Sequence, residues 1–197
     1  MSFRFDIIYE YREMFLTGAL TTLGLTFVAT LGGSLLGLFG ALARIIRFEK
    51  GGAPLKALAW LLRNLSALYV TVFRGTPLFV QIFIWYFVWL AALIHPNGGW
   101  LVDGQAAVEL RRSYGAVIAG VLALTANSGA YITEIFRAGI QSIDKGQMEA
   151  ARSLGMTYPQ AMRFVILPQA VRRMLPPLAN EFITLLKDSS LLSAIAV

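Results

Sequence analysis

A long run without a single charged side chain, from Met14 to Ala43, constrains this chain more than any other feature. A helix rises about 1.5 Å per residue, so this run exceeds the roughly 20 residues that cross the hydrocarbon core of a bilayer. Small residues recur in it every four positions, at Gly33, Gly37 and Ala41. They share one helical face, where a neighbouring helix can approach closely. The run therefore predicts a tilted or protruding membrane span, packed through this face against its own subunit or another one.

The composition agrees with a membrane protein built as one domain. Of the 197 residues, 57% are hydrophobic and 14% are charged, whereas soluble domains usually have about 25% charged residues. Cysteine is absent, which excludes a disulfide framework and a thiolate metal site. The net charge of +6 comes from basic residues beside apolar segments. This is the pattern of the positive-inside rule, so we interpret it as membrane orientation and not as nucleic-acid binding.

Hydrophobicity predicts three further spans and one amphipathic helix. The segment Leu55–Val72 is interrupted by charged and polar residues, so we interpret it as an amphipathic helix, steep or near the interface, and not as a clean span. An external loop is expected from His95 to Ser113, with the only histidine as a surface residue. The further spans are predicted at Leu78–Ile94, Tyr114–Phe136 and Leu178–Leu192, the last one beginning around Pro176 and Pro177.

Charge bias predicts how these spans are oriented. Basic residues gather after the first span, from 44 to 56, and again between 137 and 173. Both segments are therefore expected in the cytoplasm, which places the N-terminal tail outside. The first residues lack an apolar core followed by a small-residue cleavage site, so no cleavable signal peptide is expected and the first span directs insertion.

The stretch Gly146–Pro177 is too polar to lie inside a bilayer and is predicted to form two short helices. Gly155 is expected to end the first helix in the left-handed conformation. Pro168 is expected to end the second, because proline lacks an N–H and disfavours helix in the residue before it. Two residue pairs have the spacing of a capping box: Asp144 with Gln147, and Thr157 with Gln160.

The same stretch contains Glu149-Ala150-Ala151, then Gly155, then Ile166-Leu167-Pro168. This pattern resembles the EAA loop of the permease subunits of ABC importers. Three other blocks resemble the polar amino-acid permeases of the histidine/glutamine type: Phe73–Pro77, Tyr131–Arg137 and Leu186–Leu191.

The resemblance runs from about Thr17 to Val197. It implies an all-α integral membrane protein: a type I ABC-importer transmembrane domain over residues 1–197, with about four spans and a cytoplasmic EAA loop. The last helix of the family is expected to be missing from this sequence.

The resemblance also implies a function: a permease subunit that moves polar amino acids across the bacterial cytoplasmic (inner) membrane. The implied partners are two ABC ATPase subunits, a second permease copy or homologous permease, and an extracytoplasmic amino-acid-binding protein. ATP and magnesium are then bound by the ATPase, and this chain is a non-catalytic subunit without cofactor or metal. The lack of a G-x-x-x-x-G-K-[ST] phosphate loop agrees with that. The implied coupling residues are Glu149, Ala150, Ala151, Gly155, Ile166, Leu167 and Pro168.

Polar residues at membrane depth are candidates for the substrate pathway, because burying them in a bilayer is costly. Asn127, Tyr131 and Glu134 share one face of the span 114–136. We expect this face, with the adjacent Ser128, to line the pathway and contact the amino and carboxylate groups of an amino acid. Alternatively, Glu134 only pairs with Arg74 or Arg137 to hold the fold. The residues assigned to such structural or ion-pair roles are Arg74, Arg137, Glu181, Lys187 and Asp188.

Two other classes of function are open at this point. The polar face of the third span also fits an ATP-independent secondary carrier or channel for small polar solutes. Secondary carriers usually show repeated halves with broken helices, which the sequence does not display. A membrane scaffold without transport activity is the weaker possibility.

Overall fold

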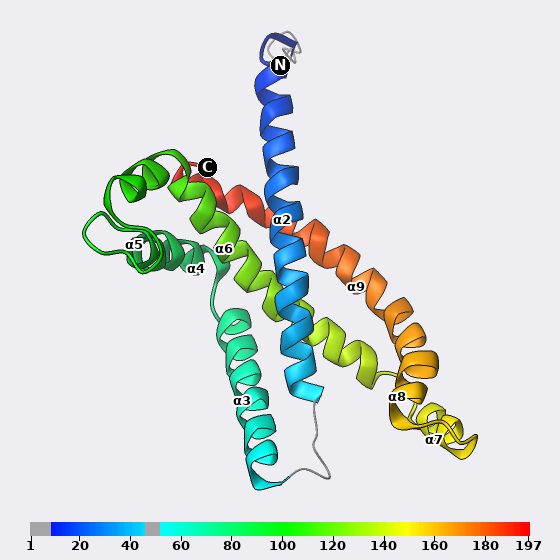
Figure 1. Ribbon diagram of the computed structural model, residues 1–197. Helices are drawn as coiled ribbons and strands as arrows, with labels where there is room; N and C mark the ends of the chain where they lie inside the picture. Colours follow the sequence, from blue (N-terminus) through cyan, green and yellow to red (C-terminus); the bar gives the residue numbers. More distant parts are fainter. Residues whose placement is uncertain (1–8, 46–51) are drawn as a thin grey trace.

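Helices make up nearly all of the described chain, residues 9–45 and 52–197 of this computed structural model (Figure 1). Within these residues there is no strand, which confirms the all-α fold class. The four long helices are α2 (Arg12–Ile45), α3 (Ala53–Gly75), α6 (Gly104–Gln141) and α9 (Leu167–Asp188). The shorter elements are α4 (Leu78–Ile84), the π-helix η1 (Trp85–Trp89), α5 (Leu90–Leu93), α7 (Lys145–Ser153), α8 (Tyr158–Ala161), the π-helix η2 (Met162–Ile166) and the 3₁₀-helix η3 (Ser189–Ile195).

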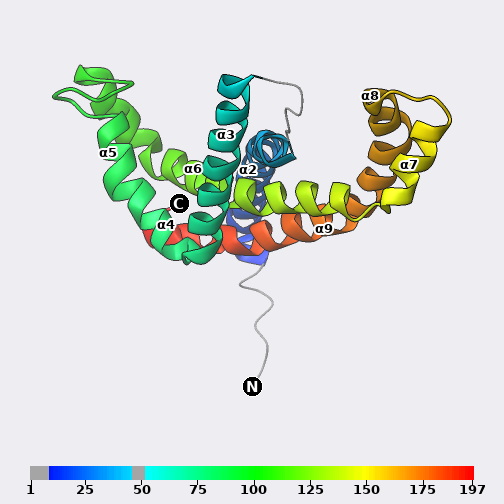
Figure 2. The same cartoon turned by 90° about the horizontal axis from the view of Figure 1, so that it is seen from below.

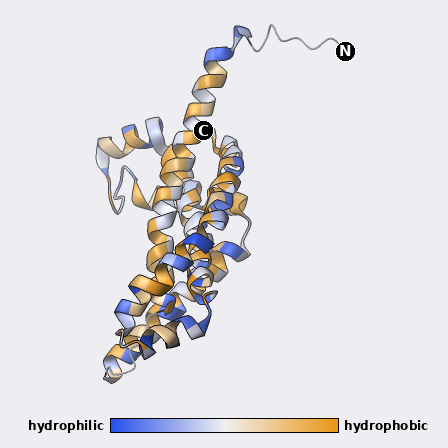
Figure 3. Ribbon diagram, turned by 90° about the vertical axis from the view of Figure 1, so that its right-hand side faces the viewer, coloured by the Kyte–Doolittle hydropathy of each residue, from blue (hydrophilic) through white to orange (hydrophobic). Residues whose placement is uncertain are grey.

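Two helices, α2 and α6, are long and apolar enough to cross a membrane by length and composition. A third candidate span forms only when α3 is taken together with the segment Leu78–Leu93, and the two are bent by 108° at their junction. The predicted helix Leu55–Val72 lies inside α3, and the predicted span Leu78–Ile94 follows the bend, where it forms α4, η1 and α5. Figure 3 shows α2 as mainly hydrophobic along its length, with hydrophilic residues at its N-terminal end.

The expected external loop from His95 to Ser113 is too long, because α6 already begins at Gly104. The true connection after α5 is short and is held by backbone hydrogen bonds. Trp100 N donates to the carbonyl of Ala92 at 3.0 Å, and His95 N donates to the carbonyl of Val102 at 3.1 Å. The residues that follow are mostly good helix formers, so the helix starts about ten residues before the apolar run.

The prediction that Pro168 ends a helix is wrong. The chain continues from α8 through η2 into α9 without a break. In η2 the N–H of Leu167 donates to the carbonyl of Met162, five residues back. This wider turn lies directly before Pro168 and accommodates a residue that has no N–H. The predicted span Leu178–Leu192 consequently does not begin at Pro176, since both Pro176 and Pro177 lie inside α9. Among the described helices α9 is not one that is long and apolar enough to cross a membrane by length and composition.

The small-residue face of α2 packs against α6 of the same subunit. A Cβ added to Gly33 would lie 3.0 Å from Ser128 Cβ, and one added to Gly37 would lie 2.6 Å from Ile132 Cγ2. Ala41 on the same face is 1% exposed. The close approach predicted from the spacing of these residues therefore joins two helices of one chain.

Hydrogen bonds attach α3 to these two helices. Ser66 Oγ donates to the carbonyl of Gly40 at 2.9 Å, and the Tyr69 hydroxyl donates to the carbonyl of Ala126 at 2.6 Å. In both cases a side chain bonds to a helix carbonyl, which lets polar groups hold helices together where water is scarce.

The helices α7 and α8 project from the body of the molecule. They lie at the same end as the C-terminus of α2 and the N-terminus of α3 (Figure 1), and Figure 2 shows them separated from α4 and α5 by the long helices. The described ends of the first basic segment, Arg44 and Lys56, thus share one end of the fold with the second, while Arg47 and Lys50 lie outside the described residues.

Candidate functional site

The first helix of the projecting unit begins as its sequence predicts. Asp144 is the N-cap of α7, and its Oδ1 accepts a hydrogen bond from Gly146 N at 2.6 Å. The second half of this expected capping box differs, since Gln147 Oε1 instead accepts from Gln169 Nε2 at 3.4 Å. The other expected box is present, because Gln160 Oε1 accepts from Thr157 N at 2.8 Å.

Gly155 ends the first helix in the conformation that its sequence position predicts, with φ +85°. Its N–H donates to the carbonyl of Arg152 at 3.0 Å, and Met156 N donates to the carbonyl of Ala151 at 3.2 Å. This pair of bonds defines a Schellman motif, which satisfies the last carbonyls of a helix and reverses the chain. The turn between α7 and α8 therefore has a defined conformation that its own backbone hydrogen bonds hold.

The projecting α7–α8 unit rests on a small apolar cluster at its base. The cluster consists of Ile143, before α7, Ile166 of η2, and Ala170 and Met174 of α9, and Met148 of α7 packs against it. Within the unit, Ala151 is 4% exposed, whereas Glu149 and Ala150 lie on the solvent side.

Three large apolar side chains on this unit and in the adjoining η2 remain outside the cluster: Leu154 is 82% exposed, Phe164 of η2 63% and Tyr158 52%. Large apolar side chains exposed beyond a membrane span are candidates for contact with another protein. The EAA pattern did not identify these three residues. Large apolar residues in so polar a stretch were nevertheless a signal from which an exposed contact surface could have been predicted.

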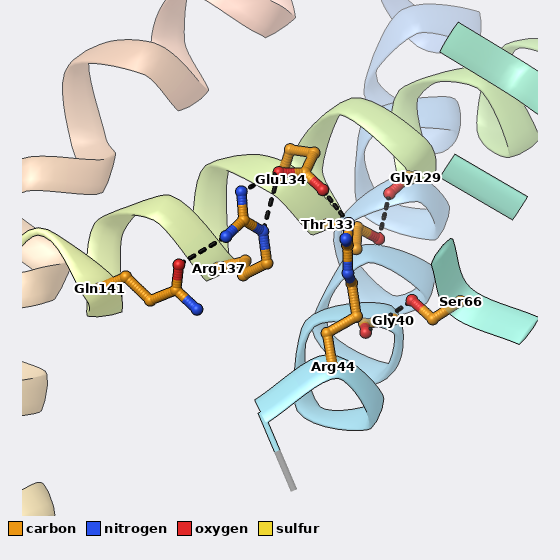
Figure 4. Close-up of polar contacts among 8 residues, drawn as sticks. All are labelled: Gly40, Arg44, Ser66, Gly129, Thr133, Glu134, Arg137 and Gln141. Atoms are coloured by element: carbon orange, nitrogen blue, oxygen red, sulfur yellow. Dashed lines mark hydrogen bonds and ion pairs between the residues drawn. The ribbon is translucent and has the colours of Figure 1, made fainter. Parts of the chain in front are cut away.

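Glu134 is the centre of an ion-pair network on α6 (Figure 4). Its Oε2 accepts from Arg137 Nη2 at 2.6 Å and from Arg137 Nε at 2.9 Å, while its Oε1 contacts Arg44 Nη1 of α2. Arg137 also donates to Gln141 Oε1 at 2.5 Å. Of the two ion pairs that the structural alternative offered for Glu134, the pair with Arg137 is present, and no ion pair with Arg74 occurs among the described residues. Whether Glu134 also contacts substrate stays a prediction. Arg44, ninety residues away in sequence, was not anticipated.

Asn127 and Ser128 lie deeper in the packed helices than a substrate-lining role suggests. Asn127 is 6% exposed, and its Nδ2 donates to Gln81 Oε1 at 3.1 Å. Ser128 is fully buried, and its Oγ has no hydrogen-bond partner among the described residues. The Glu181 carboxylate approaches this hydroxyl without reaching hydrogen-bond geometry. Whether these residues contact substrate stays a prediction.

Gln81 stabilises the bend between α3 and α4 through hydrogen bonds, a role that its sequence context did not reveal. Its Nε2 donates to the carbonyls of Phe73 at 2.8 Å and Thr76 at 3.0 Å, which are left free where α3 ends. The same amide receives the bond from Asn127, so it connects the bend to α6. Gln81 is 6% exposed, and its amide groups thus work in a nearly dry site.

We expect Gln81→Leu to destabilise the protein by about 2 kcal/mol, because Asn127 and the carbonyls at the end of α3 lose their partner while buried. For a chain of this size the midpoint of thermal unfolding should fall by roughly 4–8 °C. Intrinsic tryptophan fluorescence in detergent micelles measures it. Gln105→Leu, an exposed position at the start of α6, is the matched control and should leave the midpoint unchanged. Equal shifts for both variants would contradict this role of Gln81.

An open groove of about 580 Å³ lies along α6 beside the Glu134 network. The Arg74 guanidinium lies over the ring of Tyr131, 5.0 Å from its centroid. The groove is lined by Arg74, Tyr131, Glu134, Ser142, Arg173 and Pro177, together with small and apolar residues of α6. Two of the four predicted pathway residues, Tyr131 and Glu134, are thus brought to one cavity, while Asn127 and Ser128 are not among its lining residues.

The charged residues near the end of α9 do not form ion pairs with one another in the described chain. Lys187 is exposed, and Glu181 and Asp188 are partly exposed. A polar stripe follows this helix at helical spacing, through Arg173, Asn180, Thr184 and Lys187. In the described residues no group of acidic or histidine side chains is arranged to hold a metal ion.

Comparison with known proteins agrees with this architecture. A family model described as "Binding-protein-dependent transport system inner membrane component" matches residues 53–197. A probable glutamine ABC transporter permease protein of Bacillus subtilis is 40% identical over 97% of this chain and 75% of its own length. The glutamine transport system permease protein of Escherichia coli K12 is 34% identical over the whole chain and 78% of its own. A crystal structure of an amino acid ABC transporter with histidines superposes with a TM-score of 0.75 at 39% identity, covering 100% of this chain and 78% of that one.

Proposed function

Because the chain belongs to the family of inner membrane components of binding-protein-dependent transport systems, and is an amino-acid ABC transporter permease, we propose that it carries polar amino acids across the cytoplasmic membrane. The energy comes from ATP hydrolysis on two separate ATPase subunits, which hold the nucleotide and magnesium. A second permease copy or a homologous permease completes the pathway, and an extracytoplasmic binding protein delivers the substrate. Its N-terminus lies outside and its α7–α8 unit in the cytoplasm.

The projecting α7–α8 unit is the observation that carries the coupling role. Its turn is fixed by the Schellman motif at Gly155 and its base by the apolar core around Ile166. A unit held in this way can transmit a rigid-body displacement, whereas a flexible loop would absorb it. Its apolar surface of Leu154, Tyr158 and Phe164 is suited to a cleft of the ATPase subunit.

A direct path leads from this unit into the membrane helices. Since α8, η2 and α9 are continuous through Ile166, Leu167 and Pro168, movement of the unit tilts α9 as one body. The polar stripe of α9 and the groove beside Glu134 then change their exposure to the two sides of the membrane. Family membership disfavours the secondary carrier and the scaffold, which need no such unit.

The coupling proposal predicts that Gly155→Asp abolishes amino-acid-dependent stimulation of ATP hydrolysis, with a reduction of at least about tenfold. An aspartate at φ +85° is strained, and loss of the Schellman turn misplaces α8. Glu149→Lys, on the exposed side of α7, should also reduce it by altering the contact charge. The measurement is ATPase activity of the assembled transporter in proteoliposomes with and without loaded binding protein.

The matched control for these variants is Glu109→Lys, an exposed position near the other end of α6. It makes the same charge reversal far from the α7–α8 unit and should preserve stimulation. If Gly155→Asp assembled normally and kept full stimulation, the coupling role would be wrong, while uptake of amino acids by the wild type would still support the transport function.

A further inference from the structure

The groove beside Glu134 carries a surplus of positive charge. Its one carboxylate, Glu134, already contacts two guanidinium groups, those of Arg44 and Arg137. Arg173 donates to the carbonyl of Ser142 at 2.5 Å, which satisfies donors but does not balance charge. Within the described residues no carboxylate lies within ion-pair distance of Arg74 or Arg173.

Arg74 is the member of this set placed to receive a ligand. It lies at the end of α3, directly before the 108° bend, and its side chain is exposed in the isolated subunit. The guanidinium carbon of Arg74 lies over the ring of Tyr131, 5.0 Å from its centroid, and among the described residues no carboxylate forms an ion pair with this guanidinium. The groove around it is lined by the polar side chains of Tyr131, Glu134, Ser142 and Arg173. A charged side chain in such surroundings faces water and not lipid.

We propose that Arg74 binds the α-carboxylate of the amino acid in this groove, with Tyr131 holding the guanidinium in place. A planar guanidinium pairs with a carboxylate through two parallel hydrogen bonds, which gives both strength and orientation. Every amino acid has this carboxylate, so the contact recognises the substrate class and leaves the side chain to other groups. The inference rests on the proposed transport function and adds a binding residue to it.

The test is equilibrium binding of radiolabelled L-glutamine to the assembled transporter in nanodiscs of zwitterionic lipid. The competitor 4-aminobutanamide is glutamine without its carboxylate. Wild type should prefer glutamine by about tenfold or more, the value of one charged hydrogen-bonded pair. Arg74→Gln should weaken glutamine binding about tenfold and leave binding of 4-aminobutanamide unchanged. Arg74→Lys should keep part of the preference, and Arg63→Gln, exposed on the same helix, should keep all of it.

Two results would overturn the inference. One is an Arg74→Gln variant that keeps the wild-type preference for glutamine over 4-aminobutanamide. The other is an Arg74→Gln variant that loses binding of glutamine and of 4-aminobutanamide to the same extent, which would make Arg74 a structural residue of the groove and not the partner of the carboxylate. Nucleotide-driven uptake of amino acids by the wild type distinguishes these two results from a failure of the proposed transport function. If the wild type took up no amino acid, the proposed function itself would be wrong.

Discussion

Replacing Glu134 with glutamine should lower the free energy of unfolding by about 3 kcal/mol, the largest effect expected of any single polar substitution here. Its carboxylate lies between Arg44 and Arg137, and its side chain is 17% exposed. Without that charge, two partly buried guanidinium groups, 23% and 29% exposed, repel each other. This repulsion destabilises the contact between α2 and α6 near Arg44, which the ion pair with Glu134 stabilises in the wild type.

A double-mutant cycle distinguishes this mechanism from general damage to α6. Arg44→Gln combined with Glu134→Gln removes one of the two facing cations, so it should be more stable than Glu134→Gln alone. Thermal unfolding followed by tryptophan fluorescence should show a midpoint roughly 6–12 °C lower for Glu134→Gln. Glu109→Gln, on the same helix and exposed, is the control. Additive effects of the two substitutions would show that Arg44 and Glu134 do not interact.

Gly37→Val should be comparably damaging for a steric reason. A Cβ at this position lies 2.6 Å from Ile132 Cγ2 and 3.0 Å from the backbone nitrogen of Thr133. Because a helix backbone cannot yield as a flexible side chain does, α2 and α6 must separate, and contacts along both helices weaken. We expect a loss of about 3 kcal/mol for valine and about half of that for alanine.

Another glycine of α2 supplies a control, because its replacement is expected to raise stability instead of lowering it. Gly24 also lies within α2, but nothing lies within 4 Å of its Cβ position. Gly24→Ala should therefore raise stability by up to about 1 kcal/mol, since alanine favours helix over glycine. Unfolding midpoints of Gly37→Ala and Gly24→Ala should move in opposite directions. If both moved downward, helix packing would not be the cause of the effect at Gly37.

The features that the sequence predicted correctly are local ones. The span from Met14 to Ala43, the N-cap at Asp144 and the left-handed glycine at 155 each follow from a few neighbouring residues and their backbone preferences. The small-residue face of α2 was local too, although the sequence left open which helix packs on it. The prediction at Pro168 was also local and was wrong, because a π-turn formed by the surrounding packing accommodates the proline.

What the sequence by itself determined is therefore an all-α membrane protein with a capped, polar helix–turn–helix, since hydrophobic runs, charge bias and capping residues act over short distances. The permease function came from its resemblance to a known family. Only the tertiary structure decided which distant side chains meet. It brought Arg44 to Glu134, placed Gln81 between the end of α3 and Asn127, and laid Arg74 over Tyr131. Such contacts depend on how long helices cross and bend. A shift of one residue in their packing would give every one of these side chains a different partner.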